Sequence, residues 1–486
     1  MEPIRAHITT YGCQMNQLDA EVVAERLRTS GARVVDDPAD ANVLLFLTCS
    51  VRAHAEQRVF SNIGALKARK RAEPGLVIGL LGCMAQQHGE AIRRRAPLVD
   101  LVCAPARLAE LPDLIARARA ARGGPAVALD PPRADGGREA FQALDAVLDA
   151  SETARPLGGP SPGHAYVTVM RGCDNFCAYC VVPNVRGPER SRAPAAVLEE
   201  VRRLVGQGAR QITLLGQAVN QYAAEEGGRR WDLAALVERV AETPGLARLN
   251  FITNHPRAMT ARLAGVFRDV PRVCPYLHMP AQSGSDAVLE RMNRGYTAAE
   301  YAQRVAMVRD AQPEVAVASD FIVGFPGETQ GHFEATLDLV RRTRFSGGFV
   351  FKYSPRPGTL AARQYADDVP AAEKRRRNQA LLDGLQQVAG RENQRLVGRR
   401  ESVFVEGPSP RPGLDRRGAD AATDAPAGSP APSGPGRCQW RGRTPGNRIV
   451  VFDGPAGLAG REVDVDIRRA MPLTLFGVLV GEGITQ

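Results

Sequence analysis

The chain has 486 residues, which predicts roughly three domains at about 150 residues each. Hydrophobic residues make up 44% of it, and this excludes a wholly disordered chain. The formal net charge of +10 favours a polyanionic partner or an anionic surface. The longest apolar run, residues 76–85, has half the length of a membrane-spanning helix, and the first residues lack the apolar segment of a secretory signal. We therefore expect a cytoplasmic protein outside the membrane.

The first hundred residues repeat one unit, in which an apolar run typical of a β-strand leads to a cysteine and then to a helical pattern. The runs 7–10, 43–47, 76–81 and 101–102 lead to Cys13, Cys49, Cys83 and Cys103. Strands that alternate with helices predict an α/β domain with a doubly wound parallel sheet over residues 1–122. The carboxyl ends of neighbouring strands line one crevice in such a sheet, so these cysteines are expected at one edge.

The Gly-, Pro- and Asp-rich segment 123–163 is typical of an interdomain linker. The alternation of strands and helices then resumes over residues 164–398. Six strands are expected, at 166–170, 211–215, 248–253, 276–279, 316–323 and 348–353. Each is followed by a loop with glycine or polar residues, which is the pattern of a barrel enzyme. Six units instead of eight predict a partial (β/α)6 barrel, closed by a long polar helix over residues 371–398.

The last part of the chain, 399–482, changes character. Short strands are expected at 402–406, 449–452, 463–467 and 474–480, and they predict a small β-barrel. Residues 407–436 interrupt it. Thirteen of these thirty residues are Gly or Pro, so we expect a disordered and dispensable insert.

Three of the nine cysteines form the tight cluster C-x3-C-x2-C at Cys173, Cys177 and Cys180. Three thiolates can hold three irons of a [4Fe–4S] cube and leave the fourth iron open. A structural zinc site normally needs four protein ligands, and the sequence offers no fourth one nearby. The cluster follows directly after the first expected barrel strand. An iron–sulfur centre at the barrel mouth is thus the favoured interpretation, with zinc or inert thiols as the alternatives.

The segment RGCDNFCAYCVVP resembles the cluster loop of radical S-adenosylmethionine (SAM) enzymes, and more closely that of their methylthiotransferase branch. The phrases LLGQAVNQY, HMPAQSGSD, RGYT, SDFIVGFPGET and YSPRPGT also resemble that family. The resemblance implies that the open iron of the first cluster binds SAM. It further implies that Tyr179 lies near the adenine, that Gly216 and Gln217 contact the methionine amino group, and that the loop from Gly324 to Glu328 lies near the adenosine.

The same resemblance implies a second [4Fe–4S] cluster on Cys13, Cys49 and Cys83. Spacing alone leaves three unrelated buried thiols as the alternative. The phrases TYGCQMN, LTCSVR and LGCMAQ match the family, in which this cluster carries the sulfur that is transferred. Cys103, Cys274 and Cys438 have no counterpart in the family pattern and are expected to be structural or incidental.

The terminal barrel resembles the TRAM module, an OB-like nucleic-acid-binding barrel. Arg441, Arg443 and Arg448 in this barrel, with Arg186, Arg190 and Lys352 on barrel loops, are expected to contact RNA phosphates. A solvated charged face is the alternative, because residues 396–486 carry 12 basic and 10 acidic side chains. The phrase GRTPGNR resembles the tRNA-modifying members.

The resemblance therefore implies methylthiolation at C2 of N6-isopentenyl(dimethylallyl)adenosine at position 37 in the anticodon loop of tRNA, with a flipped base. It also implies an electron donor such as flavodoxin or ferredoxin, a sulfur donor and a monomeric enzyme. Three alternatives stay open: threonylcarbamoyladenosine in tRNA, an aspartate of a ribosomal protein, and a non-enzymatic iron–sulfur RNA-binding protein. The sequence departs from the family pattern at Ala218, Asn254, Met279 and Ala281.

Overall fold

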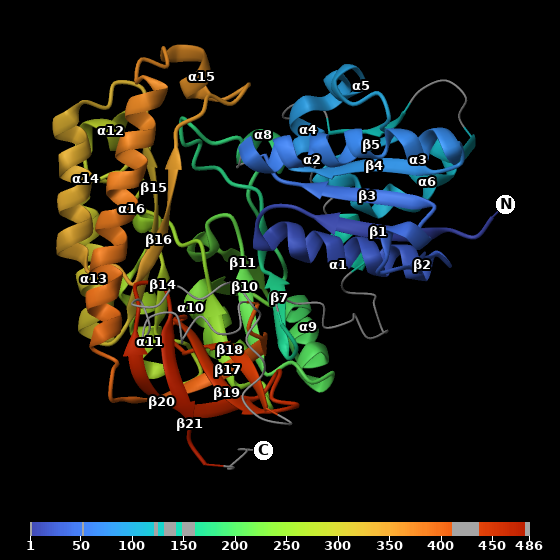
Figure 1. Ribbon diagram of the computed structural model, residues 1–486. Helices are drawn as coiled ribbons and strands as arrows, with labels where there is room; N and C mark the ends of the chain where they lie inside the picture. The colour runs from blue at the N-terminus through green and yellow to red at the C-terminus, as the bar shows by residue number, and fades with distance from the viewer. Residues whose placement is uncertain are drawn as a thin grey trace, which may run out of the picture.

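The computed structural model describes residues 2–50, 53–120, 125–130, 142–147, 161–410 and 437–481. The described chain forms an N-terminal sheet domain, a central barrel and a small C-terminal barrel (Figure 1). The N-terminal domain lies beside the mouth of the central barrel, and the C-terminal barrel lies against its opposite end. None of the described helices is long and apolar enough to cross a membrane.

The N-terminal domain is built on a six-stranded parallel sheet with the order β2-β1-β3-β4-β5-β6. This confirms the predicted doubly wound architecture. The chain leaves β1 toward β2 on one side and continues to β3 on the other, so the topological switch point lies between β1 and β3. The strands are β1 (Arg5–Thr10), β2 (Arg33–Val34), β3 (Val43–Thr48), β4 (Val77–Gly82), β5 (Leu101–Cys103) and β6 (Ala126–Ala128).

Helices cover both faces of this sheet, and each face has its own apolar core. Strands β3 and β4 are buried along their whole length because helices pack on both sides of them. The helices are α1 (Gln14–Thr29), α2 (Ala53–Ala65), α3 (Lys67–Ala72), α4 (Cys83–His88), α5 (Ile92–Arg95) and α6 (Leu111–Ala120).

The prediction that residues 123–163 form a linker is wrong in part. Ala126–Ala128 pairs with β5 as the edge strand β6. A helical turn at 142–147 also places Leu144 in the core of the N-terminal domain. Gly- and Pro-rich composition identifies a connection but does not exclude a short edge strand within it. Residues 131–141 and 148–160 of this segment lie outside the described residues.

The central domain has the six expected strands in sequential order: β7 (His164–Thr168), β10 (Gln211–Leu215), β13 (Arg248–Phe251), β14 (Tyr276–His278), β15 (Ala316–Val323) and β16 (Gly347–Lys352). The pairs within each half are parallel. The two halves meet through a parallel bridge between Leu249 and Val273. The backbone N–H of Asn254 also donates to the His278 carbonyl, at 3.0 Å. The outer layer includes α9 (Pro194–Gly206), α10 (Leu233–Ala241), α11 (Ala261–Asp269), α12 (Asp286–Arg291), α13 (Ala298–Ala311) and α14 (Gln330–Thr343).

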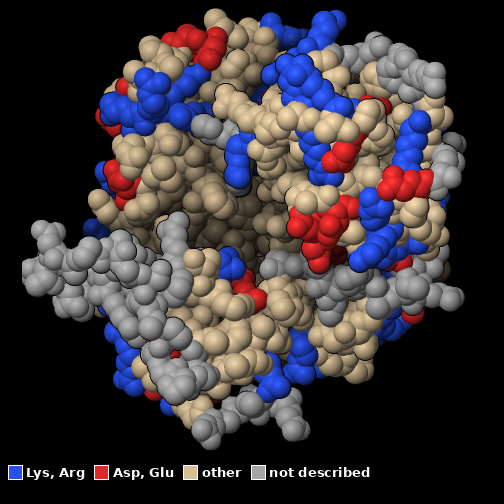
Figure 2. Space-filling model, turned by 45° about the vertical axis from the view of Figure 1, so that its right-hand side comes forward, with Lys and Arg blue, Asp and Glu red and all other residues tan. Residues whose placement is uncertain are grey.

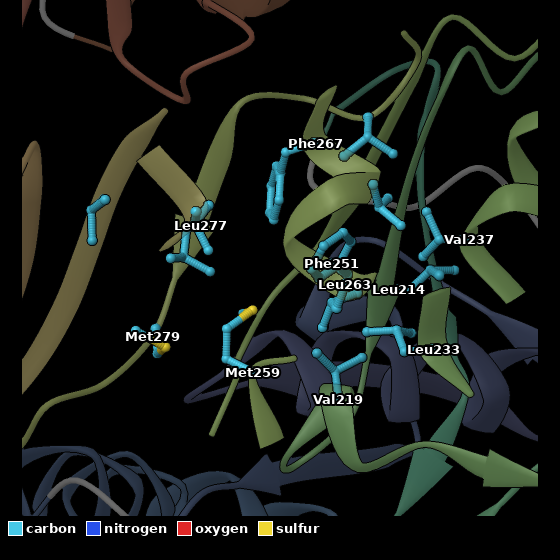
Figure 3. Close-up of a cluster of buried hydrophobic side chains, with 14 of the residues drawn as sticks. Leu214, Val219, Leu233, Val237, Phe251, Met259, Leu263, Phe267, Leu277 and Met279 are labelled. Carbon is cyan, nitrogen blue, oxygen red and sulfur yellow. The ribbon is translucent and has the colours of Figure 1, made fainter. Parts of the chain in front are cut away.

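One continuous apolar core joins these strands to the helices outside them. In the first half, side chains from β10 and β13, such as Leu214 and Phe251, lie against Leu233, Leu263 and neighbouring residues of α10 and α11 (Figure 3). Burying a side chain of this size contributes about 1.5–3 kcal/mol. The packed wall fixes the strand ends, and therefore the loops that carry the candidate site.

The C-terminal domain is a closed barrel with the order β17-β18-β19-β21-β20. The strands are β17 (Arg400–Pro408), β18 (Arg437–Arg443), β19 (Ile449–Pro455), β20 (Glu462–Ala470) and β21 (Leu475–Leu479). Sequence analysis missed β18 because its arginines were interpreted only as an RNA contact. The insert also begins later than predicted, since Pro408 still pairs with Trp440. Residues 411–436 lie outside the described residues.

The predicted long polar helix is α16 (Ala371–Gln394), which packs along β16 at the edge of the central barrel. Although it is rich in charge, Lys374 and Arg377 are only 5% exposed. The smaller elements near the mouth are α8 (Val182–Val185), the strand pair β8 (Met170–Arg171) and β9 (Arg190–Ser191), and α15 (Leu360–Gln364).

Candidate active site

Cys13, Cys49 and Cys83 follow three neighbouring strands, β1, β3 and β4, and come together at the switch point of the N-terminal sheet. Gly12 has a positive φ of 126°, and a Cβ atom there would lie 2.3 Å from Cβ of Cys49. The loop after β1 therefore approaches Cys49 as only glycine permits. An interaction with the Cys49 thiol lowers the pKa of Cys13 to about 6, and Arg186 favours the thiolate further. Burial raises the pKa of Cys83, and the charge of Arg186 opposes this shift.

Cys173, Cys177 and Cys180 lie on the loop after β8 at the barrel mouth. Gly172 starts this loop with φ 72°, and a Cβ atom there would lie 1.9 Å from the Pro188 carbonyl oxygen. The Asn175 amide donates to Sγ of Cys173 at 3.1 Å, and the Val182 N–H donates to Sγ of Cys180 at 3.4 Å. Burial, together with the neighbouring Cys177, raises the pKa of Cys180 to about 12. That thiol is therefore protonated at neutral pH, and binding of a metal cluster would require the loss of its proton.

Arg294 is a buried guanidinium beside this loop that sequence analysis missed. Its Nη1 donates to Sγ of Cys177 at 3.1 Å and lies 3.4 Å from the Tyr179 hydroxyl. Its Nε donates to the Tyr296 hydroxyl at 2.9 Å, and its Nη2 donates to the Pro280 carbonyl at 3.2 Å. Arg294 therefore fixes the orientation of the Cys177 side chain. The phrase RGYT contains this residue, but the pattern alone did not indicate that its side chain contacts Cys177.

A cavity of about 860 Å³ lies between the N-terminal domain and the barrel mouth. One end is lined by Ser50, the residue after Cys49, and another part by Tyr179 and Cys180. The space-filling view shows this face of the molecule hollowed at its centre, with Lys and Arg side chains at several points around the hollow (Figure 2). Strand β16 and helix α16 supply much of the remaining wall, including Phe349, Phe351, Lys352, Lys374, Arg375 and Asn378.

Among the predicted SAM residues, Tyr179 and Gln217 are available to a ligand, whereas Gly216 is packed against the protein. Tyr179 lines the cavity, and the buried Oε1 of Gln217 has no hydrogen-bond partner among the described residues. An orphaned acceptor at a strand end is suited to a ligand ammonium. Gly216 is closely packed, because a Cβ atom there would lie 2.4 Å from Cγ of Met170.

Glu328 forms an ion pair within the barrel wall, while its buried Oε1 has no hydrogen-bond partner among the described residues, so its place near the adenosine stays a prediction. Its Oε2 accepts from the Gly324 N–H at 2.6 Å and pairs with Nη1 of Arg377 at 2.7 Å. Gly324 has φ 69°, and a Cβ atom there would lie 2.4 Å from Cγ of Lys374. Glu328 therefore shapes the Gly324 loop and ties it to α16.

The predicted RNA-contact residues differ in how exposed their side chains are. Lys352 is exposed at the cavity, Arg190 is half-buried, and Arg441 and Arg443 are about one-third exposed and pair with Glu406. The prediction for Arg186 is wrong because its side chain is buried, whereas the RNA contact of the half-buried Arg448 stays a prediction. The Arg448 Nε donates to Asn393 of α16 at 3.0 Å, and burial lowers its pKa. Arg186 is 3% exposed and pairs with Asp19 at 2.7 Å.

The other cysteines lie in cores or strands. The side chain of Cys103 packs among Leu108, Leu111 and Leu114 on one face of the N-terminal sheet. Cys274 is buried, and its burial raises its pKa to about 11, while Cys438 lies in β18. The departures from the family pattern are buried, and the Asn254 amide donates to the His278 carbonyl at 3.1 Å.

Each cysteine group supplies three thiols, the number that holds three irons of a [4Fe–4S] cube. Within the described residues, no three His, Cys, Asp or Glu side chains converge as a single metal ion would require. A four-iron cluster differs, because each thiolate binds a different iron. The interactions of Cys13 with Cys49 and Cys83, and of Cys180 with Cys173 and Cys177, agree with such a donor set.

Two family models match the chain. Residues 5–104 match the Uncharacterized protein family UPF0004, and residues 167–340 match the Radical SAM superfamily. A protein named tRNA-2-methylthio-N(6)-dimethylallyladenosine synthase from Rhodopirellula baltica is 44% identical over 97% of this chain and 94% of its own. A relative with the same name from Citrifermentans bemidjiense is 40% identical over 98% of both chains. The chain belongs to the radical SAM methylthiotransferase family.

Among solved structures, the radical SAM methyltransferase TsrM from Kitasatospora setae, with cobalamin and a [4Fe-4S] cluster bound, superposes with a TM-score of 0.50. The sequences are 14% identical, and the match covers 74% of this chain and 77% of that one. This similarity concerns the fold. It supports the arrangement of an α/β domain beside a radical SAM barrel.

Proposed function

We propose that this enzyme adds a methylthio group to C2 of N6-isopentenyl(dimethylallyl)adenosine at position 37 of tRNA. The observation that carries the proposal is the cavity between the two cysteine groups, which has Cys180 in one part of its wall and Ser50, next to Cys49, in another. Such a space allows one substrate atom to meet groups held at both sites. The names of the full-length relatives support the choice of substrate.

Cys173, Cys177 and Cys180 would hold one [4Fe–4S] cluster with SAM, and Cys13, Cys49 and Cys83 would hold a second. When bound, these groups supply the electron, the carbon-centred radical, the sulfur and the methyl group. The chain's own residues orient and enclose them. Arg294 fixes Cys177, the free acceptor of Gln217 is available to the SAM ammonium, and the packed loop around Gly324 forms part of the barrel mouth.

The walls of the cavity are suited to an isopentenylated base. Phe349 is 58% exposed, and its ring lies 6.2 Å from that of Phe351. Exposed rings can stack on a flipped base and cover an apolar substituent. Lys352 lies in the same wall, where a cation favours the phosphates that flank the base.

The remaining roles rest on the chemistry of the reaction. The enzyme requires an electron donor such as flavodoxin or ferredoxin and a donor of sulfur. Since tRNA is the substrate and the thiols must stay reduced, we assign the enzyme to the cytoplasm. We propose that it acts as a monomer, because one chain contains both cysteine groups and the cavity.

The test uses anaerobically reconstituted protein with SAM, a reductant and tRNA that carries isopentenyladenosine. A methylthio mass gain on that nucleoside supports the proposal. 5′-Deoxyadenosine without a mass gain would move the assignment to threonylcarbamoyladenosine or to the ribosomal aspartate. If clusters are present and neither product forms, the enzyme proposal fails.

Two cysteine variants separate the roles of the sites. Cys180→Ala should abolish both SAM cleavage and methylthiolation. Cys49→Ala should retain SAM cleavage and lose the methylthio product. Cys103→Ala is the matched control, because it removes a buried thiol at the end of another strand of the same sheet. Wild-type product from Cys49→Ala would exclude the second cluster from the reaction.

A further inference from the structure

Arg186 belongs to the barrel, but its guanidinium lies among residues of the N-terminal domain. It follows α8 on the segment after the barrel cysteines. Its Nη2 donates to Oδ2 of Asp19 at 2.7 Å and lies 3.2 Å from Oδ1 of Asn16, and both partners belong to α1. The side chain of Arg186 is 3% exposed, and that of Asp19 is 1% exposed. A charged pair this deeply buried needs complete partners on every side.

The Arg186 guanidinium also lies near the N-terminal cysteines, because Oδ1 of Asn16 accepts from both Arg186, at 3.2 Å, and Sγ of Cys13, at 3.8 Å. Its positive charge favours the thiolate forms of Cys13 and Cys83, and those thiolates in turn favour the charged guanidinium. Its buried Nη1 has no hydrogen bond of normal geometry to any described residue. A buried guanidinium donor without an acceptor is costly, and thiolate or sulfide would satisfy it.

The contact surface around Arg186 brings the same residues together. Cys83 packs against Val181 and Val185 of the barrel. Cys13 packs against a small apolar cluster in which Met15 and Leu18 of α1 meet Tyr166 and Leu215 of the barrel. The N-terminal cysteine site therefore lies at the domain interface, and the barrel supplies part of its wall.

We infer that Arg186 is a positioning residue of the N-terminal cluster: the barrel supplies it to offset the thiolate charge and to hold the cluster, through Asp19, against the barrel mouth. This inference rests on the proposed function. It assigns to the barrel a role in a site whose ligands all lie in the other domain. Because a nearby cation stabilises the reduced cluster, Arg186 should also raise that cluster's reduction potential.

The test is made in the full chain with Cys173, Cys177 and Cys180 replaced by Ala, so that only the N-terminal cluster remains. Iron and sulfide per chain and the reduction potential from an EPR titration are measured. Arg186→Met should lose most of the iron or shift the potential to more negative values. Arg186→Lys, which keeps the charge but has fewer donors, should recover part of the iron.

Arg192→Met is the matched control. Arg192 is also buried and pairs with Glu200 at 2.6 Å, so this variant also removes the arginine of a buried ion pair. It should keep the parent's iron and potential. Equal losses in the two variants would mean that Arg186 stabilises only the fold.

A second variant tests the inference in case Arg186→Met does not fold. The double variant Arg186→Gln with Asp19→Asn removes both charges, and Arg171, the other partner of Asp19, keeps its ion pair with Asp145. It should fold, as judged by circular dichroism, and still lose iron or shift in potential. Parental iron and potential in the double variant would overturn the inference. If the triple-alanine parent itself binds no iron, the proposed second cluster fails, and that result is separate from the role of Arg186.

Discussion

Two buried arginines, Arg294 and Arg186, each serve one of the cysteine groups. Arg294 donates to Sγ of Cys177 at 3.1 Å, whereas the charge of Arg186 favours the thiolates of Cys13 and Cys83. Both guanidinium groups stay protonated at any physiological pH, so each is a fixed positive charge in a region with little water. At the residue scale, each cysteine group therefore has a buried positive charge beside it.

Arg294→Met should shift the reduction potential of the barrel cluster to more negative values and slow SAM cleavage. The variant loses a hydrogen bond to a charged acceptor, which typically contributes about 1.5–3 kcal/mol. The measurement is an EPR-monitored titration with Cys13, Cys49 and Cys83 replaced by Ala. Arg291→Met is the control, because Arg291 donates to the Pro326 carbonyl at 3.1 Å. An unchanged potential in Arg294→Met would contradict this role.

At the element scale, side chains of α16 bind two segments at the barrel mouth. Arg377 donates to both the side chain and the carbonyl of Glu328, at 2.7 Å each. Lys374, one turn earlier, bonds Asp367 and the Tyr353 carbonyl. The Gly324 loop and the segment after β16 are thus held by one helix. Some charged side chains of α16 therefore form buried ion pairs, and the others are solvated.

Arg377→Met should destabilise the protein by about 3–5 kcal/mol at neutral pH, because it leaves the buried Glu328 carboxylate unpaired. Burial already raises the pKa of Glu328 above its usual value. A raised carboxyl pKa gives stability that is present at low pH and is lost as the pH rises through that pKa. The defect should therefore shrink as the pH falls toward 5, which thermal unfolding at several pH values will measure. A defect that does not depend on pH would contradict this explanation.

At the scale of the whole molecule, the central barrel joins both neighbouring domains through buried charge. Arg248 of β13 pairs with Glu462 of the C-terminal barrel at 2.6 Å and donates to the Arg443 carbonyl at 2.8 Å. His164 lies at the same junction, 2.9 Å from the Thr213 hydroxyl. On the other side, Arg171 pairs with Asp19 at 3.1 Å. These contacts fix the domains relative to the mouth.

The junction at His164 should weaken in mild acid. Burial, and then Arg443 and Arg248, lower the pKa of His164 to about 3. The unfolded chain takes up this proton near pH 6.5, so stability is lost as the pH falls below that value. Between pH 7.5 and 5.5 the loss is about 1.4 kcal/mol. Thermal unfolding of the wild type and His164→Gln will measure it, and the variant should show the smaller pH dependence. Equal pH dependence in both would exclude His164 as the source.

The insert within the C-terminal barrel should be dispensable. Where the described chain stops and resumes, Pro408 pairs with Trp440, and the Ser409 N–H donates to the Gln439 carbonyl at 2.8 Å. The two ends therefore leave the barrel side by side, and an Asn-Gly turn in place of residues 411–436 can close the hairpin. Circular dichroism and tRNA modification should stay at wild-type levels. A folded variant that no longer modifies tRNA would show that the insert takes part in function.

The sequence by itself determined the three-part architecture, the six barrel strands and the two groups of three cysteines. The strands and the barrel cysteine group depend on local patterns, namely apolar periodicity and short ligand spacing, whereas the N-terminal cysteine group was indicated by the strand before each cysteine and by the family phrases. Only the tertiary structure decided what the charged side chains do. Arg186 and Arg448 were expected at RNA, and Glu328 at the cofactor, yet each is bound to a distant residue of the chain. A charged residue looks the same in sequence whether it is solvated or buried, because only the packing of remote elements supplies its partner.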